Sequence, residues 1–178
     1  MKIYKIGLIG CGRIGTLLEK DELRGKPCTH AGGFSALSNA KMVAGCDIDR
    51  SRLKNFGIHW GVDHLYEDYH EMLRREKLDV VCIAAWTNLH AVMVMDVARS
   101  GVKAIFCEKP IALNLNDARQ MVRLCKIKNV PLIINHERRW DGYYQKAHQV
   151  IKAGKIGEIR TIIGNALSSR PGKQPARS

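Results

Sequence analysis

The sequence predicts an α/β protein built on a doubly wound, mostly parallel β-sheet. Strand-like and helix-like segments alternate about every 25 residues as far as residue 135, which is typical of right-handed βαβ units. The run Val80–Ala85 is apolar throughout, as expected of a parallel strand that is buried on both faces. A glycine-rich turn follows the first strand-like segment directly. These three observations together favour this fold class.

The first strand is predicted over Ile3–Ile9, and the turn that follows it has the spacing G-x-G-x-x-G over Gly10–Gly15. We expect a helix over Arg13–Lys20. In this spacing the first glycine permits a tight turn, the second lets the backbone approach a pyrophosphate, and the third lets the helix pack closely on the strand. The helix N-terminus adds free N–H groups for an anion. The context favours a Rossmann fold that binds a dinucleotide over a merely tight turn.

The second strand is predicted over Met42–Cys46 and ends at Asp47. In dinucleotide-binding folds an acidic residue follows the last glycine by about 20 residues and binds the ribose hydroxyls. Here the interval from Gly15 is 32 residues. We attribute the excess to a loop inserted within residues 20–39, ahead of a short helical piece near residues 34–38.

Asp47 is therefore the candidate ligand of the adenosine ribose. A carboxylate at this position disfavours a 2′-phosphate, so NAD is preferred as cofactor, although the nearby Arg50 and Arg52 leave NADP possible. The alternative interpretation is that Asp47 caps the helix that begins at Arg50.

The remaining elements are predicted from periodicity and from capping residues. A capping box over Asp68–Glu71 opens a helix through Arg75, and Thr87 or Asn88 caps a helix that reaches Ser100 and stops at Gly101. The other expected elements are strands over Asp79–Ala85, Ala104–Cys107 and Val130–Asn135 and a helix over Asn116–Lys128.

Ligands of such sheets bind at the carboxyl ends of the strands. That rule brings five separate segments to one surface: Gly10–Gly15, Asp47, Trp86–His90, Glu108–Pro110 and Asn135–Trp140.

Glu108–Pro110 follows a predicted strand and accompanies the N-terminal glycine turn. Together with Thr87–His90, Asn135–Trp140 and Gly154–Ile159, these motifs resemble the Gfo/Idh/MocA family of NAD(P)-dependent oxidoreductases over about residues 2–166. The resemblance implies hydride transfer between a nicotinamide and a small-molecule substrate, namely a sugar, a polyol or a related hydroxy or keto compound.

The resemblance also implies roles for particular residues. Lys109, often followed in the family by a cis proline, is the catalytic candidate that assists proton transfer or orients the reacting hydroxyl. A lysine whose pKa is lowered by burial can act as such a base; the alternative is an exposed lysine on a turn made rigid by Pro110. The expected cofactor-binding residues are Gly10, Cys11, Gly12, Arg13, Ile14, Gly15, Asp47, Trp86, Thr87, Asn88, His90, Glu108, Lys109 and Pro110. His90 is as often structural as functional in such a position, and Arg138 and Arg139 could bind an anion or form salt bridges.

We expect three regions: a dinucleotide-binding domain over residues 1–135, a linker helix and the first strand of a truncated substrate domain over residues 136–168, and a disordered basic tail over residues 169–178. The strand Ile159–Ile163 would present an open edge, so self-association is expected. Without the second α/β domain of the family, the chain could instead be a non-catalytic dinucleotide-binding module.

Composition narrows the class of protein. Lys and Arg outnumber Asp and Glu by 29 to 17, which gives a net charge of +12. The basic residues are scattered without interleaved aromatic residues, and this pattern argues against nucleic-acid binding as the function. The six cysteines form no C-x-x-C pair, and no metal site is expected. No apolar run is long enough to span a membrane, and a cytoplasmic location is expected.

Overall fold

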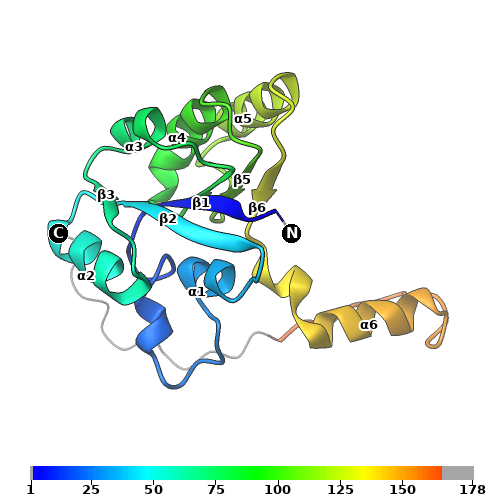
Figure 1. The fold of residues 1–178 in the computed structure, drawn as a ribbon. Helices are drawn as coiled ribbons and strands as arrows, with labels where there is room; N and C mark the ends of the chain where they lie inside the picture. The colour runs from blue at the N-terminus through cyan, green and yellow to red at the C-terminus, as the bar shows by residue number, and fades with distance from the viewer. Residues whose placement is uncertain (1, 166–178) are drawn as a thin grey trace. The chain divides into compact units, whose positions relative to one another are not determined.

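The chain divides into two compact units, Met1–His136 and Glu137–Ser178, and the computed structural model describes residues 2–165. The strands of the first unit are β1 Tyr4–Ile9, β2 Ala40–Cys46, β3 His64–Tyr66, β4 Val80–Ile83, β5 Ala104–Cys107 and β6 Leu132–Ile134. Its helices are the 3₁₀ helix η1 Leu17–Lys20, α1 His30–Ser35, α2 Arg50–Trp60, α3 Tyr69–Arg75, α4 Thr87–Arg99 and α5 Leu115–Ile127 (Figure 1).

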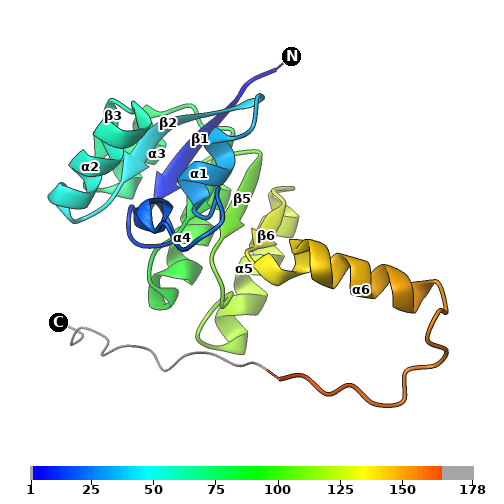
Figure 2. The ribbon, with the colours of Figure 1, turned by 90° about the horizontal axis from the view of Figure 1, so that it is seen from below.

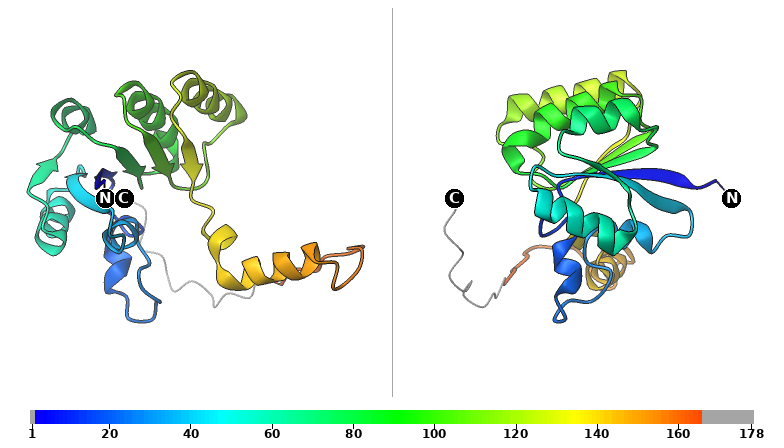
Figure 3. Two further views of the ribbon diagram at one scale, coloured as in Figure 1. Left: turned by 45° about the vertical axis from the view of Figure 1, so that its right-hand side comes forward. Right: turned by 60° about the vertical axis from the view of Figure 1, so that its left-hand side comes forward.

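The six strands form one parallel sheet in the order β3-β2-β1-β4-β5-β6 (Figure 3). β1 lies in the middle and pairs with β2 on one side and β4 on the other. The chain order of the strands reverses there, so the switch point at which such sheets bind ligands falls between β1 and β4. The predicted doubly wound fold is confirmed, and the sequence analysis missed only the short strand β3.

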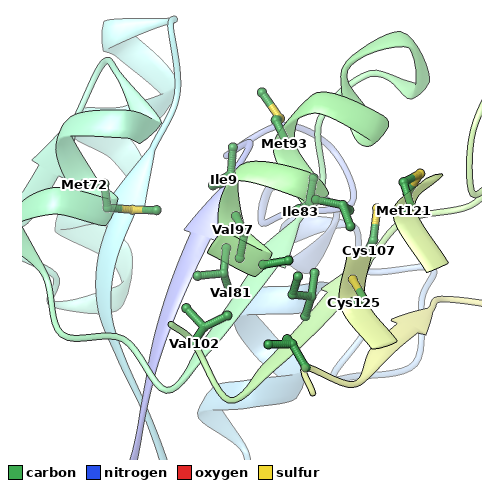
Figure 4. Packing of buried hydrophobic residues seen from close by; sticks show 14 of the residues in the cluster. Ile9, Met72, Val81, Ile83, Met93, Val97, Val102, Cys107, Met121 and Cys125 are labelled. Carbon is green, nitrogen blue, oxygen red and sulfur yellow. The ribbon is translucent and has the colours of Figure 1, made fainter. Parts of the chain in front are cut away.

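Helices cover both faces of the sheet. α3, α4 and α5 lie on one face, and α1 and α2 lie on the other (Figure 1). Because alternate side chains of a strand point to opposite faces, β4 sends Val81 and Ile83 to the α4–α5 side and Cys82 to the α1–α2 side. Figure 4 shows Val81 and Ile83 among Val97 of α4 and Met121 of α5. The central strands are therefore buried on both faces.

The helix that follows the glycine turn is interrupted by an insertion. The carbonyls of Ile14 and Gly15 accept hydrogen bonds from the N–H groups of His30 and Ala31, each at 3.0 Å. In an uninterrupted helix these donors would be residues 18 and 19. Twelve residues, 18–29, are thus inserted after the first helical turn. Without them the interval between Gly15 and Asp47 shortens from 32 to 20 residues, the spacing of dinucleotide-binding folds.

The predicted helix over Arg13–Lys20 is wrong in detail. The chain makes a single turn after the glycines and then the 3₁₀ helix η1, and the helix resumes as α1 (Figure 2). The carboxylate of Glu19 closes the inserted loop by accepting hydrogen bonds from the Thr29 hydroxyl at 2.5 Å and the Cys28 N–H at 3.2 Å. Glu19 therefore joins the beginning of the inserted loop to its end.

Two predicted caps also differ from the structure. Asp49 caps α2 by accepting from the N–H groups of Ser51 and Arg52, so the interpretation of Asp47 as that cap is wrong. The N-cap of α4 is Trp86, whose side chain makes no capping bond, so neither Thr87 nor Asn88 caps it. Asp68 does cap α3, and Gly101 follows α4 with a φ of 86°.

The second unit begins with the 3₁₀ helix η2 Glu137–Trp140 and the helix α6 Gly142–Lys152. Asp141 caps α6 by accepting from the N–H groups of Tyr143 and Tyr144. Residues 153–165 include no strand, so the expected strand over Ile159–Ile163 is wrong. The expected self-association rested on that strand and stays a prediction. The expected disordered tail, residues 169–178, lies outside the described residues.

Truncation of a core side chain tests the packing of α5 on the sheet. Met121 has no exposed surface, whereas its neighbour Val122 is 53% exposed. We expect Met121→Ala to lower the free energy of unfolding by about 2 to 5 kcal/mol, because it leaves a cavity. Val122→Ala is the matched control and should change it by less than about 0.5 kcal/mol. Urea denaturation measures both, and equal effects would contradict this packing.

Candidate functional site

The glycine turn begins at Gly10, directly after β1. Gly10 has a φ of +95°, and a Cβ there would lie 2.7 Å from the backbone of Ala84. A Cβ on Gly15 would overlap the carbonyl oxygen of Gly10. The turn geometry therefore explains the first and third glycines. A Cβ on Gly12, in contrast, would meet no atom within 4 Å.

Asp47 holds the glycine turn against the end of β2. Its buried carboxylate accepts the Cys11 N–H at 2.7 Å through Oδ2 and the Asp49 N–H at 2.8 Å through Oδ1. The N–H of Cys11 is thus already engaged within the protein. The thiol of Cys11 is fully buried. Burial and the nearby charge of Asp47 raise the pKa of this thiol. Cys11 contributes to the site through its backbone and its packing.

The β4–α4 connection presents exposed and buried side chains. Trp86 is 77% exposed, whereas His90 is only 1% exposed. Nδ1 of His90 lies 2.8 Å from the carbonyl of Pro110, and Nε2 lies 3.1 Å from the carbonyl of Ala85. Both partners are acceptors, so a neutral imidazole can donate to one and an imidazolium to both. In this structure His90 links the β4–α4 connection to the segment after β5.

Glu108 and Lys109 follow β5 and have opposite surroundings. Lys109 and Pro110 are exposed, and the peptide bond between them is cis. Glu108 is 7% exposed, and its Oε1 lies 2.8 Å from His30 Nε2 and 2.6 Å from Asn135 Nδ2. The Lys109 N–H donates to Oε2 at 3.3 Å. Lys109 therefore projects from a backbone whose neighbouring residue is anchored in the interior.

The environment of Glu108 favours its ionised form. Burial by itself raises the pKa of this carboxyl group, but the hydrogen bonds from His30 and Asn135, the charge of His30 and the Lys109 N–H outweigh burial. The pKa lies below its ordinary value of 4.5. Glu108 is therefore a buried carboxylate at neutral pH, at the carboxyl end of β5.

The structure brings most of the expected residues to the carboxyl edge of the sheet. The glycine turn, Asp47, Trp86–His90 and Glu108–Pro110 follow β1, β2, β4 and β5 respectively. Sequence reasoning missed His30. This residue is far from the glycine turn in the sequence, but it lies next to the turn in the structure because the helix resumes there after the insertion. The 12-residue excess before Asp47 was the available signal. Arg138 lies in the second unit, with its guanidinium 5.8 Å from the ring centre of Tyr144.

Residues 2–165 include no group of three or more His, Cys, Asp or Glu side chains placed to hold a metal ion. Within the same residues, no helix has the length and apolar character needed to cross a membrane.

The sheet order, the glycine turn and an acid at the end of β2 define the class: a Rossmann-fold nucleotide-binding protein. The family model for the Gfo/Idh/MocA oxidoreductase family, NAD-binding Rossmann fold, matches residues 4–136. The chain belongs to this family.

Curated relatives match most of the chain. A D-apiose dehydrogenase from Paraburkholderia graminis is 36% identical over 88% of this chain and 38% of its own length. A myo-inositol 2-dehydrogenase from Thermotoga maritima is 32% identical over 89% of this chain and 43% of its own length. The chain therefore spans about two fifths of the length of these relatives.

A solved structure shows the same fold. The scyllo-inositol dehydrogenase from Lactobacillus casei with bound NAD(H) and scyllo-inositol superimposes with a TM-score of 0.78 and 26% identity. The match covers 88% of this chain and 43% of that protein.

The lowered pKa of Glu108 predicts a pH-dependent contribution to stability. Because the folded-state pKa is below 4.5, the contribution is present above about pH 4.5 and is lost as the pH falls through the folded-state pKa. We expect Glu108→Gln to be less stable than the parent by about 1 to 3 kcal/mol at pH 7. The difference should shrink below pH 4.5, as measured by urea denaturation across pH 3–7.

Glu22→Gln removes an exposed carboxylate from the inserted loop and is the matched control. A difference between parent and Glu108→Gln that stays constant down to pH 3 would contradict the role of the ionised carboxylate.

Proposed function

We propose that this chain binds NAD at the carboxyl edge of the sheet and carries the cofactor-binding part of an oxidoreductase that acts on a sugar or polyol. The observation that carries the proposal is the open space beside Gly12. Packing requires no glycine at this position, since a Cβ would meet nothing there. A pyrophosphate that approaches the backbone does require one.

The adenosine end of the dinucleotide would lie over Asp47. Each carboxylate oxygen accepts one backbone N–H and keeps a further lone pair for a ribose hydroxyl. Ile48 is 89% exposed and Trp86 is 77% exposed, so apolar surface is available for the adenine. These features supply the hydroxyl acceptor and the apolar contact that an adenosine needs.

Ion pairs near Asp47 favour NAD over NADP. Arg50 Nε lies 2.8 Å from a carboxylate oxygen of Glu67, and Arg52 Nε lies 3.3 Å from one of Asp49. A 2′-phosphate would have to compete with these acids and would also face the carboxylate of Asp47. Because both arginines already pair with acids, they are a weaker argument for NADP binding than their positions in the sequence suggest.

The nicotinamide end would lie toward Lys109. When bound, the nicotinamide accepts or donates the hydride. Lys109 would then take up the proton of the substrate hydroxyl as a neutral amine during oxidation and return it during reduction, or it would orient that hydroxyl. In this chain Lys109 is exposed rather than buried. The relatives named for apiose and inositol support a polyhydroxylated substrate.

Two glycine variants test cofactor binding. Gly12→Ala should fold with the stability of the parent, because its Cβ meets no atom, and should bind NAD at least about 10-fold more weakly, because the methyl group occupies the space needed by the pyrophosphate. Gly15→Ala should instead lower the melting temperature, because its Cβ overlaps the Gly10 carbonyl. Calorimetric titration and thermal melts measure both.

In the same titration, the parent chain should bind NADP more weakly than it binds NAD. Unchanged NAD affinity in a folded Gly12→Ala variant would refute binding at this turn.

Replacement of Lys109 tests its chemical role. Lys109→Ala should retain NAD binding within about 10-fold and lose about 100-fold or more in turnover, because a proton-transfer group typically contributes that much. NADH formation with a panel of polyols and sugars, including myo-inositol and D-apiose, measures turnover. Lys128→Ala, an exposed lysine after α5, is the matched control. If NAD binds but the parent chain turns over none of the panel, the non-catalytic dinucleotide-binding module is supported instead.

A further inference from the structure

Three polar side chains from different elements, two of them buried and one half-buried, form a cluster at the carboxyl edge of the sheet. We name His30, Glu108 and Asn135 the edge cluster. His30 begins α1, Glu108 follows β5 and Asn135 follows β6. The carboxylate oxygen Oε1 of Glu108 lies within 2.8 Å of His30 Nε2 and 2.6 Å of Asn135 Nδ2. One atom of Glu108 thus joins α1 to the ends of two strands.

His30 contacts both parts of the proposed cofactor site. Its backbone N–H donates to the carbonyl of Ile14, which lies within the glycine turn Gly10–Gly15. Its imidazole lies edge-on to the ring of Phe106, with the centres 5.3 Å apart and the planes at 76°. This packing and the hydrogen bond to Glu108 fix the orientation of the imidazole. A single residue therefore connects the glycine turn to the segment that carries Lys109.

The segment around Lys109 is held from two directions. On one side the edge cluster holds Glu108, whose Oε2 accepts the Lys109 N–H. On the other side the carbonyl of Pro110 lies 2.8 Å from His90 Nδ1. Lys109, between them, has an exposed side chain on a backbone fixed at both neighbours. The backbone position of Lys109 therefore depends on these buried contacts.

Stability alone does not account for a buried acid at this position. Replacement of a buried ion pair by well-packed apolar residues is often neutral or stabilising. Apolar side chains lie next to the edge cluster, since the ring of Phe106 packs against His30 and the ring of Phe34 packs against Phe106. What apolar residues would not supply is a directional bond to a particular backbone position. The edge cluster supplies that bond next to Lys109.

We propose that His30 is a positioning residue that, through Glu108, sets the position of Lys109 relative to the glycine turn. The inference rests on the proposed function, because it assigns His30 a part in placing the nicotinamide end of the dinucleotide. His30 would not contact the dinucleotide itself. Its effect on ligand binding passes through Lys109.

Paired titrations of the 178-residue chain with NAD and with ADP test this role. ADP carries the adenosine and the diphosphate but lacks the nicotinamide riboside. His30→Ala should weaken NAD binding about 3- to 10-fold, the loss expected for one hydrogen bond, and change ADP binding by less than about twofold. His30→Gln keeps an N–H donor that can reach Glu108 and should restore most of the NAD affinity. His148→Ala removes an exposed imidazole and is the matched control.

The double variant His30→Ala/Lys109→Ala decides whether the effect passes through Lys109. It should bind NAD no more weakly than Lys109→Ala alone, because residues that act through one another give non-additive effects. Additive losses, equal weakening of NAD and ADP, or unchanged NAD binding in a folded His30→Ala variant would each overturn the inference. If His30→Ala does not fold, the same criteria apply to His30→Asn, whose side chain is too short to place its amide where Nε2 of His30 lies. Failure of the parent chain to bind either nucleotide would instead refute the proposed function, and the inference with it.

Discussion

Two main-chain hydrogen bonds join α1 to the glycine turn at the carboxyl edge of the sheet: those that His30 and Ala31 donate to Ile14 and Gly15. The carbonyl groups of a helical turn need donors four residues later, and here the next residues in the chain leave the helix. Because α1 supplies the donors, the helix continues in space across a gap of 12 residues in the sequence. The glycine turn keeps its geometry, and His30 arrives beside Glu108. The entropic cost of the longer loop grows only slowly with its length.

Polar groups at this edge are buried in connected sets. Asp47 joins the glycine turn to β2, Glu108 joins β5 to α1 and β6, and His90 joins the β4–α4 connection to Pro110. Within the described residues, no buried side-chain nitrogen or oxygen lacks a hydrogen-bond partner. Such fully satisfied groups fix direction as well as distance, which apolar packing does not. The ends of the strands are therefore held in register where a dinucleotide would lie.

The sequence alone determined much of the fold. The apolar run through Val81 and Ile83 predicted a strand buried on both faces, because only a parallel sheet covered by helices needs one. The spacing of Gly10, Gly12 and Gly15 predicted the turn, because Gly10 and Gly15 have local steric roles in it. Cys46 and Cys107 lie in buried strands, and burial raises the pKa of each thiol to about 12.

Tertiary structure decided the remainder. From the sequence, Glu108 was expected to contact the cofactor, and the role of His90 stayed open. Their hydrogen-bond partners could not be predicted, because Glu108 and His30 are 78 positions apart in the chain and His90 and Pro110 are 20 positions apart. The strand expected over Ile159–Ile163 does not form in the described chain, since strand-forming residues need a neighbouring strand to pair with. Local sequence specifies turns, caps and apolar faces through short-range sterics. Which side chains meet at the edge of the sheet follows only from its strand order and from the helix that the insertion interrupts.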